Sequence, residues 1–188
     1  MERIETKRLI LRPWERTEKD AQDLYAYAKD PRVGPAAGWV PHKSVEESRE
    51  IVNLFAAGDE ELALVDKESG RVIGSISMFR RFPDESDKSE DQREIGYCLS
   101  PEFWGRRLMP EAVRACIRHG FERMSLQTIW CGHYDGNEKS RRVIEKCGFA
   151  FAFLKEGAVD RMGIVHPEHF YKLTKEEYPA WVKRYGDS

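Results

Sequence analysis

Stretches with a hydrophobic period of about two alternate along the chain with stretches that have the helical period of 3.6 residues. Short apolar runs bounded by Pro, Gly or polar clusters predict strands, because β-branched and aromatic residues fill them. The expected strands, in chain order, are 5–12, 62–65, 72–82, 94–99, 128–133, 149–154 and 169–173. Strands that alternate with helices in this way indicate an α/β domain built on a central sheet.

The helices are marked by their caps. Thr17, Ser44 and Asn137 each precede an amphipathic segment, and Ser44 forms a capping box with Glu47. Two further helices are expected over 109–124 and 175–184, the last of them weakened or kinked at Pro179.

The segment 109–124 carries the clearest helical pattern. Its apolar stripe consists of Ala112, Val113, Cys116, Ile117, Gly120, Phe121 and Met124, and charged residues occupy the opposite face. This helix is expected to lie with its stripe against the sheet. No repeat or interdomain linker is visible, so the expected organisation is a single domain over 1–188.

Composition removes several classes of protein. The 188 residues include 34% charged side chains, yet 31 Lys and Arg against 33 Asp and Glu leave a net charge of only -2. Nucleic acid is therefore not an expected partner. No apolar run reaches 18 residues and the N-terminus has no apolar signal region, so no membrane association or secretion is expected.

The four cysteines point to a reducing compartment. They are spaced too widely for a CxxC motif, and each lies in an apolar run. We therefore expect reduced thiols and a cytoplasmic location. No metal site is expected either, because His166 and His169 flank Pro167 and lack the HExxH spacing of a zinc site. A second reading remains open, because Cys98 and Cys131 lie on two strands that can be neighbours and could form a bridge.

Candidate chemistry begins at the turn between the strand 94–99 and the helix 109–124. Gly105, Arg106 and Arg107 precede the helix, where free backbone N–H groups and the helix dipole favour an anion. Guanidinium groups suit phosphate oxygens. The turn matches neither a Walker loop nor GxGxxG, and by itself it also fits an ordinary turn with solvated arginines.

Several segments together resemble one family. They are Thr6–Arg12, Glu94–Tyr97, Trp104–Ala112 (WGRRLMPEA), Asn137–Phe149 (NEKSRRVIEKCGF) and Phe170–Leu173. In order and spacing they resemble the GCN5-related N-acetyltransferases, and specifically the ribosomal-protein-alanine acetyltransferase branch. The resemblance implies a mixed, twisted sheet of about seven strands flanked by helices. It also implies that strands 94–99 and 128–133 splay apart and admit acetyl-CoA between them.

The resemblance also supplies the expected acetyl-CoA contacts. The pyrophosphate would lie on the loop 104–109, and Asn137 would contact the pantetheine arm. Arg107 stands where the family has glycine, and Met109 where it has a small residue. The full set of expected contacts is Tyr97, Cys98, Leu99, Trp104, Gly105, Arg106, Arg107, Leu108, Met109, Asn137 and Ser140.

Acyl transfer from a thioester to an amine needs a base, a polarised carbonyl and an acid for the leaving thiolate. The base is needed because an alkylammonium has a pKa near 10 and must lose a proton before it can attack. Glu94 is the candidate base, and a backbone N–H within Tyr97–Leu99 would polarise the carbonyl. Ser140 resembles the serine that serves as this acid in the family, and Tyr134 is the second candidate. The plainer readings are a solvated strand-edge Glu94 and an ordinary first-turn Ser140.

The expected activity is direct acetyl transfer, without a covalent enzyme intermediate, to a primary amine that is either a protein N-terminus or a small molecule. A homodimer is compatible with the family. The alternative is a catalytically silent acyl-CoA-binding sensor, which the departures at Arg107 and Met109 motivate. A nucleotide-phosphate module would leave Asn137 and Ser140 unexplained.

Overall fold

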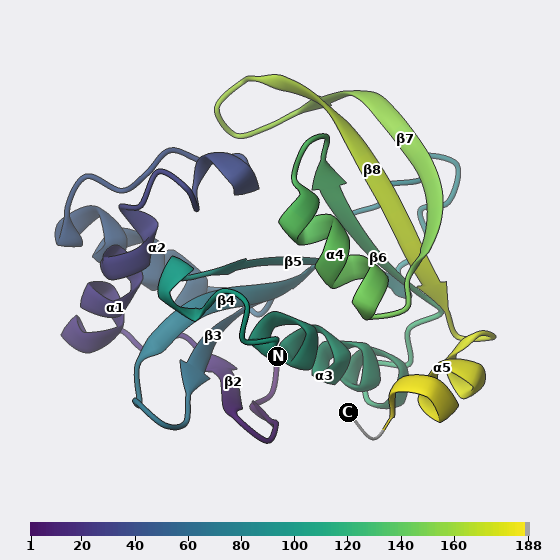
Figure 1. Cartoon of the computed structure of the whole chain (residues 1–188), viewed down its shortest axis with the longest axis horizontal. Helices are drawn as coiled ribbons and strands as arrows, with labels where there is room; N and C mark the ends of the chain where they lie inside the picture. The colour runs from purple at the N-terminus through teal and green to yellow at the C-terminus, as the bar shows by residue number, and fades with distance from the viewer. Residues whose placement is uncertain (187–188) are drawn as a thin grey trace.

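A computed structural model describes residues 1–186 as one mixed sheet with helices on both faces (Figure 1). The strand order is β1-β2-β3-β4-β5-β6-β8-β7. The strands are β1 Ile4–Glu5, β2 Leu9–Pro13, β3 Glu61–Asp66, β4 Val72–Phe79, β5 Gln92–Leu99, β6 Thr128–Tyr134, β7 Ala150–Val159 and β8 Val165–Thr174. The α/β class is confirmed, with eight strands rather than about seven, because the segment expected as one strand over 5–12 divides into β1 and β2.

The helices are α1 Glu18–Ala28, α2 Val45–Ala57, α3 Leu108–Glu122, α4 Glu138–Lys146 and α5 Tyr178–Tyr185. All three predicted caps are present, since Thr17, Ser44 and Asn137 each accept a hydrogen bond from a backbone N–H three residues on. The expected kink at Pro179 is wrong. Pro179 lies in the first turn of α5, where a backbone N–H would have no helical partner anyway.

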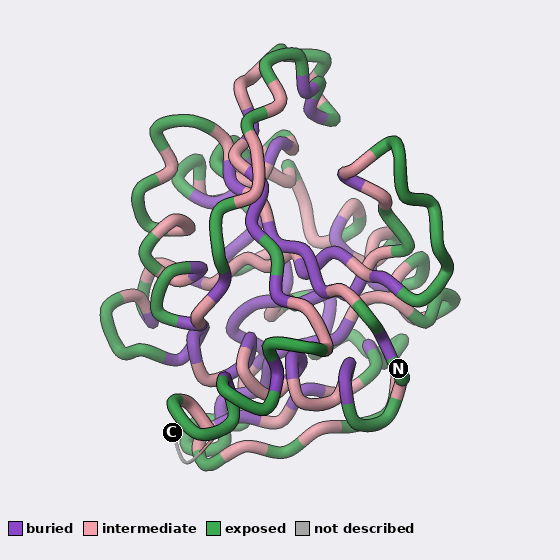
Figure 2. The backbone as a smooth tube through the Cα atoms, turned by 90° about the vertical axis from the view of Figure 1, so that its right-hand side faces the viewer, coloured by how far each residue is buried: buried purple, intermediate pink, exposed green. Residues whose placement is uncertain are grey.

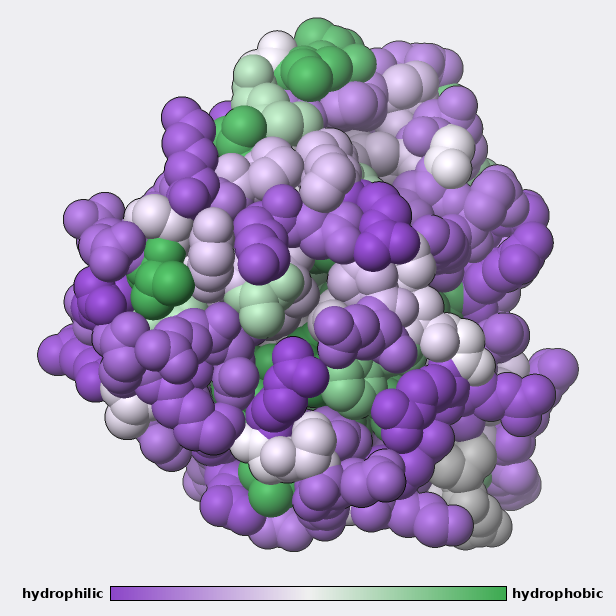
Figure 3. Space-filling model, turned by 60° about the vertical axis from the view of Figure 1, so that its left-hand side comes forward, coloured by the Kyte–Doolittle hydropathy of each residue, from purple (hydrophilic) through white to green (hydrophobic). Residues whose placement is uncertain are grey.

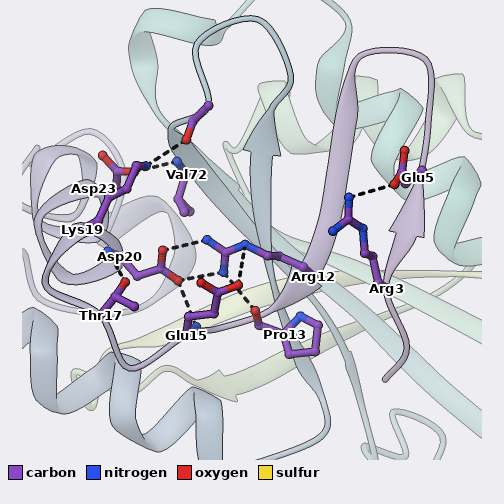
Figure 4. Close-up of polar contacts among 11 residues, drawn as sticks. Arg3, Glu5, Arg12, Pro13, Glu15, Thr17, Lys19, Asp20, Asp23 and Val72 are labelled. Carbon is purple, nitrogen blue, oxygen red and sulfur yellow. Dashed lines mark hydrogen bonds and ion pairs between the residues drawn. The ribbon is translucent and has the colours of Figure 1, made fainter.

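Helix α1 is tied to the sheet through two acidic side chains, the buried Asp20 and the half-buried Asp23 (Figure 4). Arg12 on β2 holds Asp20 through two hydrogen bonds of 2.7 and 2.8 Å, and Asp20 is only 1% exposed. Asp23 accepts a hydrogen bond of 2.9 Å from the backbone N–H of Val72 on β4. These contacts fix α1 as one wall of the cleft described below.

Alternation along the strands divides the core in two. Leu62 and Leu64 of β3 belong to the core beneath α3, whereas Ala63 and Val65 belong to the core beneath α1 and α2. The tube in Figure 2 accordingly shows buried residues along the central strands and exposed ones in the peripheral loops.

The predicted stripe of α3 is confirmed except at its last residue. Its members from Ala112 to Phe121 are buried, whereas Met124 lies beyond the end of the helix. All four cysteines are free thiols, so the possible bridge between Cys98 and Cys131 is absent. Among residues 1–186, none of the helices combines the length and the apolar composition needed to cross a bilayer.

Strands β5 and β6 separate along their length, as expected. Gln92–Ile95 pair in parallel with Thr128–Cys131, and this pairing stops there. Beyond it, β5 continues against β4 as far as Leu99, while β6 continues against β8 as far as Tyr134. The sheet therefore opens between β5 and β6, with α4 beside the opening (Figure 1).

Candidate active site

A cleft of about 1480 Å³ runs through this opening. Its lining comes from β3 to β6, the loop before α3, the first turn of α4, the loop around Trp39 and the turn between β7 and β8. Figure 3 brings the side of α1 and α2 forward and shows a mainly hydrophilic surface with hydrophobic residues in small separate groups.

The C-terminal half of β5 presents backbone N–H groups to the cleft. The N–H of Ser100 donates to Ile73 on β4 at 2.7 Å, which sets the phase of the antiparallel ladder. Since alternate residues face opposite neighbours, the N–H groups of Tyr97 and Leu99 point away from β4. On that side the pairing with β6 ends at Ile95, so both N–H groups face the opening between the two strands. Of the expected segment Tyr97–Leu99, Cys98 thus turns its N–H toward β4.

The loop before α3 has an unusual backbone. Gly105 has a φ of 78° and Arg107 a φ of 59°, so both occupy the left-handed region. Their N–H groups donate to no residue within 1–186. Left-handed residues next to a helix N-terminus gather free N–H groups into a concavity that suits an anion.

Arg8, which precedes β2, holds this loop through hydrogen bonds to its carbonyl groups. Its guanidinium donates to the carbonyl oxygens of Arg106 at 2.9 Å and Arg107 at 3.3 Å, and it pairs with Glu111 of α3 at 2.8 Å. The carbonyl groups are therefore held on the side of Arg8. The side chain of Arg106 points to Glu68 at 3.6 Å and does not line the cleft, so it lies away from the place expected for the donor.

Trp104 and α4 close the mouth of the opening. The Trp104 indole donates to the Leu99 carbonyl at 2.9 Å, and the Lys139 ammonium lies 3.5 Å from the centre of its ring. Arg142 and Lys146 also line the cleft on this side. Free N–H groups and three α4 cations around an apolar slot fit the phosphates and the extended arm of a CoA thioester. The residues present therefore match the expected acetyl-CoA.

Ser140 and Asn137 lie together at the start of α4. The Ser140 hydroxyl is 2.9 Å from the Tyr97 hydroxyl, and burial raises the pKa of that phenol well above its usual value. The Asn137 side chain caps α4 with its oxygen and donates through its nitrogen to the Ala36 carbonyl at 3.0 Å. The amide expected to be free for pantetheine thus holds the 3-10 turn Pro35–Ala37.

Glu94 lies on the opposite face of β5. It is 5% exposed, one oxygen pairs with Arg81 at 3.3 Å, and the other oxygen has no partner among the described residues. Burial raises the pKa of Glu94 to about 7, although the positive charge of Arg81 opposes the shift. The reading of Glu94 as a solvated strand-edge residue is therefore wrong.

Three charged residues near Glu94 escaped the sequence analysis. Arg81 also pairs with Glu168 at 3.3 Å, and Glu168 is 5% exposed on β8. Glu61 on β3 lines the same side of the cleft. The one signal of these residues in the sequence was the presence of a glutamate within an otherwise apolar strand pattern. Tyr134, the second candidate acid, lies opposite Glu168 in the β6–β8 register and so belongs to this carboxylate side rather than to Ser140.

Comparison with known proteins agrees with this geometry. Residues 8–150 match the model of the acetyltransferase (GNAT) domain. The uncharacterized N-acetyltransferase p20 of Bacillus licheniformis is 26% identical over 95% of this chain and 99% of its own length. The putative ribosomal N-acetyltransferase YdaF of Bacillus subtilis is 34% identical over 58% of this chain and 57% of its own.

Among solved structures, a GCN5-related N-acetyltransferase from Brucella melitensis superimposes with a TM-score of 0.83 at 21% identity, covering 99% of this chain and 84% of that one. At this identity the likeness concerns the fold alone. The match of the domain model over most of the chain shows more, and this chain belongs to the GNAT family of acetyltransferases.

Proposed function

We propose that the protein transfers the acetyl group of acetyl-CoA to a primary amine by direct attack, with Glu94 as the base. The observation that carries the proposal is the buried Glu94 carboxylate, which has one unpartnered oxygen beside the unpaired backbone of β5. A buried carboxylate with a pKa of about 7 can take a proton from an ammonium group at neutral pH. The whole of 1–188 would act as one catalytic domain.

The donor would bind between β5 and α4. The free N–H groups of Gly105 and Arg107, and those at the start of α3, would hold its phosphates. Trp104, Leu108 and Met109 line the adjoining part of the cleft. Bound there, acetyl-CoA supplies the activated acetyl group.

The protein's own groups then have separate tasks. Glu94 removes a proton from the acceptor, so that the amine becomes a nucleophile. The N–H groups of Tyr97 and Leu99 can donate to the carbonyl oxygen as negative charge develops on it. As the C–N bond forms and the C–S bond breaks, Ser140, hydrogen-bonded to Tyr97, gives the leaving sulfur a proton, and the second proton that the nitrogen releases restores the hydroxyl. No cysteine is needed as a nucleophile, and burial raises the pKa of Cys98 to about 11.

The acceptor would enter on the side of α1, α2 and the loop 31–41, where loop sequence sets specificity. Both a protein N-terminus and a small-molecule amine fit a primary-amine acceptor, and the ribosomal acetyltransferase among the relatives supports the first. We place the reaction in the cytoplasm, a location that the unpaired cysteines support.

A thiol-release assay tests this function. The protein is incubated with acetyl-CoA and a panel of amines and N-terminal peptides, and free CoA is followed over time. We expect amine-dependent release that is strongly reduced in Glu94→Gln and Ser140→Ala. Tight acetyl-CoA binding with no release on any acceptor would instead indicate a sensor and overturn the proposal.

A further inference from the structure

We infer that Arg81 is a positioning residue for the base, because its guanidinium is shared between Glu94 and Glu168 and can move from one carboxylate to the other during a turnover. This inference rests on the proposed function and adds a residue to it. Before the reaction, Arg81 would lie between the two carboxylates. Once Glu94 has taken a proton from the acceptor, Arg81 would pair with Glu168 alone.

The guanidinium lies equally far from both carboxylates. One terminal nitrogen of Arg81 is 3.3 Å from Glu94, and the other is 3.3 Å from Glu168. A charge-assisted hydrogen bond between such groups usually measures about 2.7–2.9 Å. The Arg12 guanidinium, for comparison, holds Asp20 at 2.7 and 2.8 Å. Arg81 is therefore closely paired with neither acid, and a small movement would complete its pairing with either one.

The arginine is the member of this trio that can move. Its side chain is 50% exposed and follows the end of β4, whereas each carboxylate side chain is 6% exposed and belongs to a strand. The backbone of β6 leaves just enough room for Glu168, because a Cβ at Gly132 would lie 3.1 Å from one of its oxygens. The two carboxylates are thus fixed in the sheet, and the guanidinium lies between them on the solvent side.

The other basic groups beside these carboxylates are already paired. Lys155 and His166 both lie near enough to Glu168 to lower its pKa, although burial dominates and raises that pKa. Lys155 pairs with Glu85 at 2.8 Å, and His166 pairs with Asp160 at 2.9 Å. Neither is therefore available to balance a change of charge at the base.

The remaining titratable neighbours are neutral. The Tyr134 phenol interacts electrostatically with both carboxylates, and the Cys131 thiol with Glu94. Burial raises the pKa of the phenol and of the thiol, so neither group is charged at pH 7. Within residues 1–186, Arg81 is the cation that forms ion pairs with Glu94 and Glu168.

Two acids that share one cation suit a base that gains and loses its charge inside the protein. With the whole guanidinium to itself, Glu94 would stay ionised and would be a weak base. Without Arg81, burial would keep Glu94 protonated at neutral pH. Between these limits, burial raises the pKa of Glu94 to about 7 against the partial opposition of Arg81.

The proton and the guanidinium would move together. An N–H bond of the acceptor ammonium breaks, and an O–H bond forms on the oxygen of Glu94 that has no partner among the described residues. The negative charge of Glu94 disappears in this step, so Arg81 moves to Glu168, which remains ionised. After the product leaves, Glu94 releases its proton to water and Arg81 returns to the shared position.

Crystal structures of the wild type and of two isosteric variants at pH 7 test the movement. Glu94→Gln resembles the protonated base, and we expect both terminal nitrogens of Arg81 to lie within about 2.9 Å of Glu168 in this variant. In Glu168→Gln, both nitrogens should instead approach Glu94 to the same distance. A guanidinium that keeps its midway position in both variants would overturn the inference.

The pH dependence of kcat/KM tests whether Arg81 serves the reaction. In Arg81→Met, kcat/KM should fall about fivefold or more at pH 7 and return close to the wild-type value at pH 9, where Glu94 ionises without the cation. Arg81→Lys keeps the charge and should lose less at pH 7. Arg49→Met, which removes an exposed arginine paired with Glu18, is the control. An equal loss at every pH would indicate a merely structural role and would overturn the inference.

The two proposals fail separately. If acetylation occurs but Arg81 stays in place in both variants, the inference fails and acetyl transfer remains intact. If no acceptor is acetylated, the proposed function fails, and the two variant structures still decide whether Arg81 moves between the carboxylates. Melting temperatures of all variants exclude misfolding as the cause of a loss.

Discussion

The hydroxyl oxygens of Tyr97 on β5 and Ser140 on α4 lie 2.9 Å apart beside the opening in the sheet. Tyr97 also lies 3.2 Å from the Ser140 carbonyl, to which its hydroxyl can donate. The two side chains therefore form a hydrogen-bonded pair that joins the separated strand to the helix. In the proposed reaction this pair, rather than Ser140 alone, supplies the proton to the leaving sulfur.

Replacing either member should reveal this coupling. We expect Ser140→Ala to lower kcat by about 10²-fold or more, as for loss of a general acid, and Tyr97→Phe to lower it less. The double variant should lose less than the product of the two single losses, because the hydroxyls act together. Steady-state kinetics of the four proteins measures this. Strictly multiplicative losses would show that the two groups act separately.

The pH dependence of activity tests Glu94. Its carboxylate must be ionised to accept a proton, so kcat/KM should rise with pH through the region of its pKa of about 7. Glu94→Gln should remove this rise and lower kcat/KM by about 10² to 10⁴-fold. Glu168→Gln is the matched control. It should keep the rise but move it to lower pH, since Glu168 helps to raise the pKa of Glu94.

The same residue should make stability depend on pH. The pKa of Glu94 is raised in the folded state, so between its usual value of 4.5 and about 7 the folded protein holds a proton that the unfolded chain has released. The free energy of unfolding should therefore fall as pH rises through this interval. Glu94→Gln should remove this part of the fall and be more stable than the wild type at pH 8, by up to about 3 kcal/mol. Urea unfolding at pH 5 and pH 8 compares them, and an equal difference at both pH values would contradict the shift.

Arg107 offers a test that separates backbone from charge. Its φ of 59° is strained for a residue with a side chain. Arg107→Gly should raise the free energy of unfolding by about 1 kcal/mol, or the melting temperature by about 2–4 °C. Arg107→Ala removes the guanidinium but keeps the strain. If the charge assists the donor, both variants should bind acetyl-CoA more weakly. A change of binding in Arg107→Gly alone would assign the effect to the backbone, because Arg107→Ala keeps the strained conformation.

Local sequence rules predicted much of the fold. Caps at Thr17, Ser44 and Asn137 and the apolar stripe of α3 depend on residues within a few positions of one another, and the structure bears them out. The departure at Arg107 was also visible in the sequence, and the structure shows the left-handed backbone that the family's glycine would favour.

The carboxylate side of the site could not be predicted in the same way. Arg81 and Glu94 lie 13 residues apart and Glu168 lies 87 residues beyond Arg81, and the sheet register brings the three together. The burial of Glu94 depends on the elements packed around it, so its raised pKa has no local signature. Glu61 stands at the start of a strand, where a solvated glutamate is the ordinary expectation.

The short parallel contact between β5 and β6 has a consequence for how the protein would respond to its donor. Only four residue pairs join these strands, and the amides of Tyr97 and Leu99 beyond them lack a strand partner. An extended ligand in the opening would take the place of the missing strand. Amide hydrogen exchange at these two positions should then be fast in the free protein and slow in the complex. The C-terminal half of β5 would therefore be protected against local opening only when the ligand is bound.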